Sequence, residues 1–118
     1  MKGHFQLIGT VHFVNVTGLN AAPSTDTIFD CGRWDEIIIQ VDALEDTNHL
    51  ATDCDINVIS KPPGATNWDT TPYAEILTIA DNEVRSEAVV PPPPEFKLRC
   101  DMNTGTRADI YVRVFGRG

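Results

Sequence analysis

Apolar and polar residues alternate along most of this chain, and the alternation is clearest in residues 95–117. There Phe96 and Leu98 alternate with charged residues, and after a short polar stretch the pattern resumes with Ile110 and Val112. A period of two places each apolar set on one face of a strand. The pattern therefore predicts a two-stranded antiparallel hairpin with one buried face and one wet face.

Six further runs are short, rich in Val, Ile and Thr, and bounded by Gly, Pro, Asn and Asp clusters, which is typical of strands separated by turns. They cover residues 5–16, 25–30, 34–44, 52–60, 72–80 and 83–90. The prolines at 91–94 cannot donate hydrogen bonds to a ladder, so they predict a rigid crossing from one sheet to the other. About eight strands and no substantial helix predict an all-β fold, an antiparallel β-sandwich or jelly-roll-like domain.

The run at 34–44 has the features of a central strand. Ile37, Ile39 and Val41 share one face, while Ile38 and Trp34 add apolar area to the other. Such a near-continuous apolar run predicts burial on both faces.

Length and charge narrow the class of protein. The chain of 118 residues predicts one domain, 1–118, and the net charge of −8 disfavours nucleic-acid binding, which needs clustered Lys and Arg. No apolar run is long enough for a membrane span, and the N-terminus has no apolar core typical of a cleaved signal peptide. Three widely spaced cysteines, Cys31, Cys54 and Cys100, predict reduced and buried thiols rather than a disulfide framework.

Residues with catalytic or ligand chemistry form no recognisable motif. His4, His12 and His49 lack a nucleophile signature, so we expect no catalytic residue and no enzymatic activity. The acidic stretch at 42–48, followed by Asp53 and Asp55, offers oxygen ligands for Ca²⁺ but lacks the spacing of a calcium loop, which favours a solvated loop and a wet strand face. We therefore predict no cofactor and no metal.

Two groups of apolar residues are candidate partner contacts. Trp34 is expected in the core, whereas Trp68 and Tyr73 lie in or beside a Pro- and Gly-containing loop and could stack on a sugar or fill a partner's pocket. Residues 1–16 carry apolar side chains on both phases of the strand, among them Phe5, Leu7, Val11 and Phe13. This pattern predicts an inter-subunit strand or arm that adds to the sheet edge of a neighbour.

The order of segments resembles a known family. The segments that carry the resemblance are FDCG at 29–32, SKPPGATNW at 60–68, DNEVRSE at 81–87, FKLRC at 96–100 and IYVRV at 110–114. They are similar to the small β-sandwich virion proteins of tailed bacteriophages, in which an S-x-D-G-x-x-W turn and a terminal hairpin recur. The resemblance spans roughly residues 29–117, and Pro63 stands where the family has Asp.

The resemblance implies a structural protein of the virion, assembled in the cytoplasm of the bacterial host. Family members act as capsid decoration (cement) proteins or small tail components, often as homotrimers, and have no catalytic residues. The implied partners are further copies of the chain and the major capsid protein or neighbouring virion proteins, with no nucleic acid and no membrane. A carbohydrate-binding β-sandwich module is the alternative from another class, and it requires exposed aromatic side chains.

Overall fold

The computed structural model describes residues 4–16, 19–21, 27–44, 54–80, 83–102 and 107–118. In these residues nine strands form two antiparallel sheets, and no α-helix is present. The strands are β1 (Gln6–Val16), β2 (Leu19–Ala21), β3 (Phe29–Asp30), β4 (Glu36–Asp42), β5 (Cys54–Ser60), β6 (Ala74–Ile79), β7 (Val84–Val89), β8 (Glu95–Met102) and β9 (Arg107–Arg117). The predicted all-β class is confirmed.

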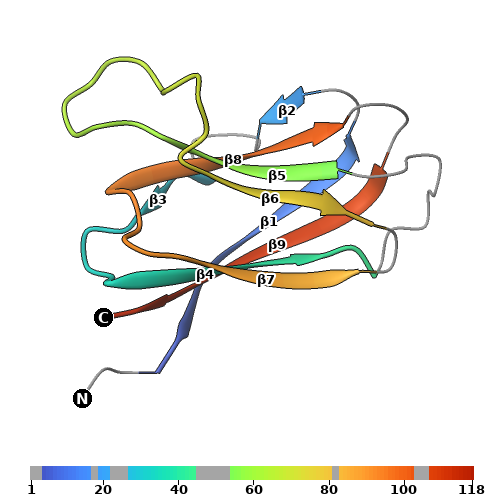
Figure 1. Ribbon diagram of the computed structural model, residues 1–118, viewed down its shortest axis with the longest axis horizontal. Coiled ribbons are helices and arrows are strands. Elements are labelled where there is room, and N and C mark those ends of the chain that lie inside the picture. The colour runs from blue at the N-terminus through green and yellow to red at the C-terminus, as the bar shows by residue number, and fades with distance from the viewer. Residues whose placement is uncertain (1–3, 17–18, 22–26, 45–53, 81–82, 103–106) are drawn as a thin grey trace.

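The two sheets stack as a sandwich (Figure 1). Sheet A has the order β1-β9-β4-β7, and sheet B has the order β2-β8-β5-β6, with β3 also pairing with β8. Sequence neighbours such as β8 and β9 therefore lie in different sheets. The hairpin predicted for residues 95–117 is wrong in this respect: both of its strands exist, but β9 pairs with β1 and β4, and β8 pairs with β5.

The core lies between the sheets and consists of one alternating set from each long strand. Its largest fully buried side chains are Phe13, Phe96, Ile37, Ile39, Ile56, Ile76, Ile79, Leu98, Ile110 and Val41. The cysteines Cys31, Cys54 and Cys100 are free and buried, as predicted. Because the inward positions follow the period of two, the core was readable from the sequence.

Most predicted strands are confirmed with small shifts in their ends. No strand was predicted between the runs at 5–16 and 25–30, and this is wrong for Leu19–Ala21, which form β2 and pair with β8. The prolines at 91–94 do connect sheet A to sheet B, since they follow β7 and precede β8. The predicted polar turn at 103–106 lies outside the described residues.

Two glycines leave the space in which two aromatic rings pack directly against the sheet backbone. A Cβ on Gly116 would lie 2.5 Å from the Trp34 ring, and a Cβ on Gly9 would lie 2.6 Å from the Phe29 ring. Phe29 in turn stacks on Phe96 with ring centroids 4.9 Å apart. Trp34 packs against the core cluster, which confirms its predicted structural role.

Candidate interaction surface

The outer face of sheet A carries side chains in rows that cross all four strands. Antiparallel register places paired residues on the same face, so a row can be followed from β1 through β9 and β4 to β7. The three rows are His12–Tyr111–Asp42–Val84, Thr10–Arg113–Gln40–Ser86 and Leu7–Phe115–Ile38–Ala88.

The third row, which we call the apolar row, has no polar side chain. Leu7 is 56% exposed and Ala88 is exposed, while Phe115 and Ile38 are half-buried. Ile38 was predicted to be buried by a second layer, and its half-exposed state shows that this prediction is wrong for the outer face. The apolar row thus offers hydrophobic area to a partner, as contiguous exposed apolar residues often do.

The other two rows are polar and internally paired. The Arg113 guanidinium donates to Asp42 Oδ2 at 2.9 Å and lies 5.6 Å from the Tyr111 ring centroid. The His12 ring stacks on Tyr111 with centroids 4.1 Å apart. These contacts fix the side chains beside the apolar row, so the face is ordered before any partner binds.

Strand β1 forms one edge of sheet A, and its sequence does not protect that edge. Among the described strands it pairs only with β9, along eleven residues that include no Lys, Arg, Asp, Glu or Pro. Natural edge strands commonly carry charge or proline, or are short or bulged, because open edges recruit other strands. A bulge between Leu7 and Gly9 is the one such device in β1.

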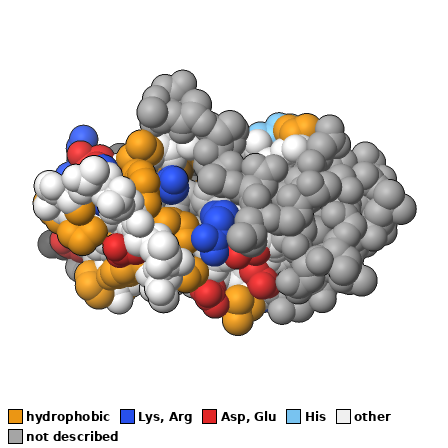
Figure 2. Space-filling view, turned by 90° about the horizontal axis from the view of Figure 1, so that it is seen from above, with side chains coloured by type: hydrophobic (Ala, Val, Ile, Leu, Met, Phe, Trp, Pro, Cys, Tyr) orange, Lys and Arg blue, Asp and Glu red, His pale blue; other side chains and the backbone are white. Residues whose placement is uncertain are grey.

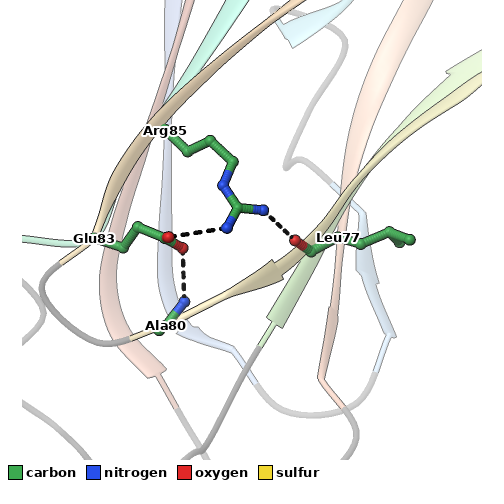
Figure 3. A network of polar contacts seen from close by, with 4 residues as sticks. All are labelled: Leu77, Ala80, Glu83 and Arg85. Atoms are coloured by element: carbon green, nitrogen blue, oxygen red, sulfur yellow. Dashed lines mark hydrogen bonds and ion pairs between the residues drawn. The ribbon is translucent and has the colours of Figure 1, made fainter.

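The edges of β6 and β7 meet at one side of the sandwich and are tied together by side chains (Figure 3). Arg85 donates to the Leu77 carbonyl at 2.6 Å and to Glu83 Oε2 at 2.9 Å, while Glu83 Oε1 accepts from the Ala80 N–H. The hydrogen bond from the Ala80 N–H, and after it the hydrogen bond and the positive charge of Arg85, lower the pKa of Glu83. At the other end of the two strands the Tyr73 hydroxyl donates to the Pro91 carbonyl at 2.6 Å.

A second candidate surface lies on sheet B, where the loop between β5 and β6 folds back. Lys61 Nζ and Lys97 Nζ lie 5.0 and 4.9 Å from the Trp68 ring centroid, which is within cation–π range. The loop is anchored because Asp69 N–H donates to the Ser60 carbonyl at 2.9 Å. Figure 2 looks down on the molecule from the top of Figure 1 and shows Lys and Arg side chains between hydrophobic and acidic ones on the described part of that face.

An open cavity of about 380 Å³ lies next to this loop. Its walls are mainly proline and glycine with three charged residues: Asp30, Lys61, Pro62, Pro63, Gly64, Ala65, Pro94 and Glu95. Lys61 and Glu95 form an ion pair at 3.4 Å, so only Asp30 among the charged residues of the wall makes no described ion pair. The cavity has rigid walls but few converging polar groups, and it therefore lacks the features of a catalytic pocket.

Cys31 follows Asp30 and has the one strongly shifted pKa among the described groups. Burial, and to a lesser extent the Asp30 carboxylate, raises the pKa of the Cys31 thiol from 9.0 to about 11. The N–H of Cys31 donates to the Pro94 carbonyl at 2.8 Å. A thiol held protonated in this way is a poor nucleophile, which suits a structural role.

This shift predicts a loss of stability at high pH. Between pH 9 and 11 the folded protein keeps the Cys31 proton while the unfolded chain releases it, so the free energy of unfolding should fall as the pH rises through that window. Urea unfolding at pH 8, 9, 10 and 11 measures the slope, and Cys31→Ala, in which this group is missing, should show a shallower one. Identical slopes for the two proteins would contradict the assignment.

The structure separates the six predicted contact residues into different environments. Val11 and Phe13 are 2% exposed and belong to the protein's own core, so their prediction as partner contacts is wrong; β1 pairs with β9, and its inward phase is used within the chain. Phe5 is half-buried, with the Arg117 guanidinium 4.5 Å from its ring centroid. Leu7 and Tyr73 are exposed, and Trp68 is half-buried beneath the two lysines.

The residues considered for catalysis or metal binding do not come together. His4 and His12 lie on or before β1, while His49 and Asp53 lie outside the described residues. Asp55 is half-buried on the outer phase of β5, and the neighbouring Asn57 donates to Asp101 Oδ2 at 2.6 Å. In the described part of the chain no three His, Cys, Asp or Glu side chains are placed to hold a metal ion.

Sequence reasoning missed two features of these surfaces. The apolar row was hidden because its residues come from four strands whose order in the sheet is β1-β9-β4-β7. Lys61 and Lys97 were not connected with Trp68, although the alternation already placed Lys97 on the outer phase of its strand. Apolar residues on the outer phase, such as Ile38 and Phe115, were the available signal for the row.

Comparisons with known proteins find a similar solved structure but no match by sequence. No protein family model matches the chain, and no curated protein matches its sequence. Within the described parts, no helix has the length and apolar character to cross a membrane. Among solved structures, the crystal structure of the SPBc2 prophage-derived protein YomS is similar to this chain, with a TM-score of 0.48 and 12% sequence identity over 93% of this chain and 94% of that one.

Proposed function

We propose that this protein is a non-enzymatic structural protein of a tailed-phage virion, and specifically a capsid decoration protein that binds the head shell as a homo-oligomer. The sequence resemblance supplies the phage assignment. The observation that carries the binding role is the outer side of sheet A, where an uncharged edge strand borders an apolar row. Both features are typical of surfaces that are covered in an assembly.

Binding would bury the apolar row against the shell. A stable protein contact buries about 800 Å² per partner, and the apolar row with its exposed Leu7 supplies hydrophobic area toward it. In the polar rows beside it, Arg113 is held by Asp42, and Tyr111 is stacked on His12. The net charge of −8 keeps the free protein soluble before assembly.

Two other functions remain as alternatives. A small tail component would use the same surface at another position in the virion. A carbohydrate-binding module needs an open aromatic platform, and it has less support because the Trp68 ring lies next to two lysine ammonium groups and the Tyr73 hydroxyl is bonded to Pro91.

The proposal is tested on phage particles produced from the genome that encodes this protein. Heads and tails are separated on a density gradient, and antibody against the protein is used on the fractions and in gold-labelled electron micrographs. We expect the protein on heads at many copies. Its presence on tails alone would favour the tail component, while its absence from particles together with binding to a glycan array would favour the carbohydrate module.

The contact surface is tested with a matched pair of variants. Leu7→Glu puts a charge in the apolar row, and Leu77→Glu puts the same charge at a similarly exposed leucine on sheet B; Leu7 is 56% exposed and Leu77 is 49% exposed. We expect Leu7→Glu to reduce occupancy on heads at least about tenfold, since a desolvated unpaired carboxylate is costly. Leu77→Glu should bind as the wild type does, and equal loss in both variants would contradict the assigned face.

A further inference from the structure

We propose that two copies of this chain pair through their β1 strands, antiparallel about a two-fold axis, so that the two A sheets join into one continuous sheet. This inference rests on the homo-oligomer part of the proposed function and does not require a virion. It specifies which surface joins the copies, and how many copies join there.

The free edge of β1 is the first observation. Eleven residues at about 3.3 Å each make an edge of roughly 36 Å along which β1 has no partner among the described strands. Its residues are Gln, Leu, Ile, Gly, Thr, Val, His, Phe and Asn, none of them acidic. Two copies that each carry a net charge of −8 repel over most approaches, and this edge is a place where they can meet without opposing carboxylates.

The other strand edges of the molecule are poor partners for the β1 strand of a second copy. The β7 edge contains Arg85 and Glu87 and is followed by prolines, and the β6 edge has its Leu77 carbonyl already occupied by Arg85 (Figure 3). On the remaining edge, β2 and β3 have three and two residues. In the described part of the chain, only the β1 edge of a second copy matches β1 in length and lack of charge, which gives a two-fold contact and not a three-fold ring.

Antiparallel pairing near the middle of β1 places polar residues opposite polar ones and apolar residues opposite apolar ones. With the axis near Val11, Thr10 of one copy lies opposite His12 of the other on the outer face, and Val11 meets Val11 on the inner face. Paired residues point to the same side of a sheet, so pairing extends each core and places both apolar rows on one face of the joined sheet. A partner could then contact both rows at once, which raises avidity.

The oligomeric state of the purified full chain tests the inference. Light scattering after gel filtration should give twice the chain mass of 13.0 kDa. Thr10→Glu places two carboxylates on the joined face roughly 7–8 Å apart, which should raise the dimer Kd at least about tenfold. The matched control is Ser86→Glu, because Thr10 and Ser86 are both exposed and share one row but lie at opposite edges of sheet A.

Disulfide trapping reports the symmetry. The native cysteines are buried, so a new exposed cysteine is the reactive one. Under mild oxidation an equimolar mixture of Thr10→Cys and His12→Cys should give a covalent dimer of the two variants, because these positions lie directly opposite each other, whereas Val14→Cys should not dimerise, because its two copies lie about 20 Å apart in an antiparallel pair. Ser86→Cys should also stay monomeric under denaturing electrophoresis.

Several results would overturn this inference. They are a monomeric wild type at 100 μM, a trimer, crosslinking through Val14 or Ser86 in preference to the pair of Thr10 and His12, or a dimer broken by Ser86→Glu but not by Thr10→Glu. A trimer would instead support the arrangement that the family resemblance implies. A monomer that still binds heads would overturn the pairing and leave the decoration role standing, so the two failures are distinguishable.

Discussion

Replacing Leu98 by alanine will lower the free energy of unfolding by about 2–5 kcal/mol. Leu98 has no exposed surface and sits on β8, opposite Val58 of β5 in the middle of sheet B. Removing its isobutyl group takes away the transfer free energy of the buried carbons and leaves a cavity that two packed sheets cannot close.

Urea unfolding followed by circular dichroism measures this effect. Leu7→Ala is the matched control, since the same side chain is removed from a position that is 56% exposed, and it should change the free energy of unfolding by less than about 0.5 kcal/mol. A change below about 0.5 kcal/mol for Leu98→Ala would remove Leu98 from the core.

Adding a single methyl group at Gly116 will destabilise the protein by about 1–3 kcal/mol through overpacking. A Cβ at this position would lie 2.5, 2.8 and 2.9 Å from three atoms of the Trp34 indole. The ring is rigid and packs against the core cluster, so relief requires movement of the whole side chain. Gly32→Ala is the control because its nearest non-neighbouring atom, Asp30 Oδ1, lies at 3.3 Å.

A double-mutant cycle isolates the steric cause of this effect. In a Trp34→Leu background the indole is missing, and Gly116→Ala should then cost much less than in the wild type. The same cost in both backgrounds would show that Trp34 is not the obstacle. Together with Leu98→Ala, this experiment separates the two ways in which the core depends on shape: loss of volume and excess of volume.

The edges of the two sheets differ in how their open backbone groups are protected. At the β6–β7 side, Arg85 and Tyr73 use side-chain hydrogen bonds to satisfy backbone carbonyls that would otherwise be open to another strand. β1 itself contains no Lys, Arg, Asp or Glu that could do the same. The unprotected edge and the adjoining apolar row therefore mark the side of the molecule on which we place its partners.

The candidate surface was predicted only in part. Leu7, Val11 and Phe13 were predicted together as partner contacts; Leu7 is exposed, whereas Val11 and Phe13 fill the protein's own core. Leu7, Val11 and Phe13 share one phase of the alternation in the sequence, and the bulge between Leu7 and Gly9 places Leu7 on the face opposite to the other two. That information is not local.

The amino-acid sequence by itself determined most of the strands, the inward phase of strands such as β4, β5 and β8, the reduced state of the cysteines and the crossing made by the prolines at 91–94. These are consequences of local rules: side chains alternate along a strand, and proline lacks an N–H. Only the tertiary structure decided that β9 lies between β1 and β4, and hence that Leu7, Phe115, Ile38 and Ala88 form one row. The physical reason is that strand order depends on how two whole sheets pack around one core, and the alternation within a strand carries no record of its neighbours.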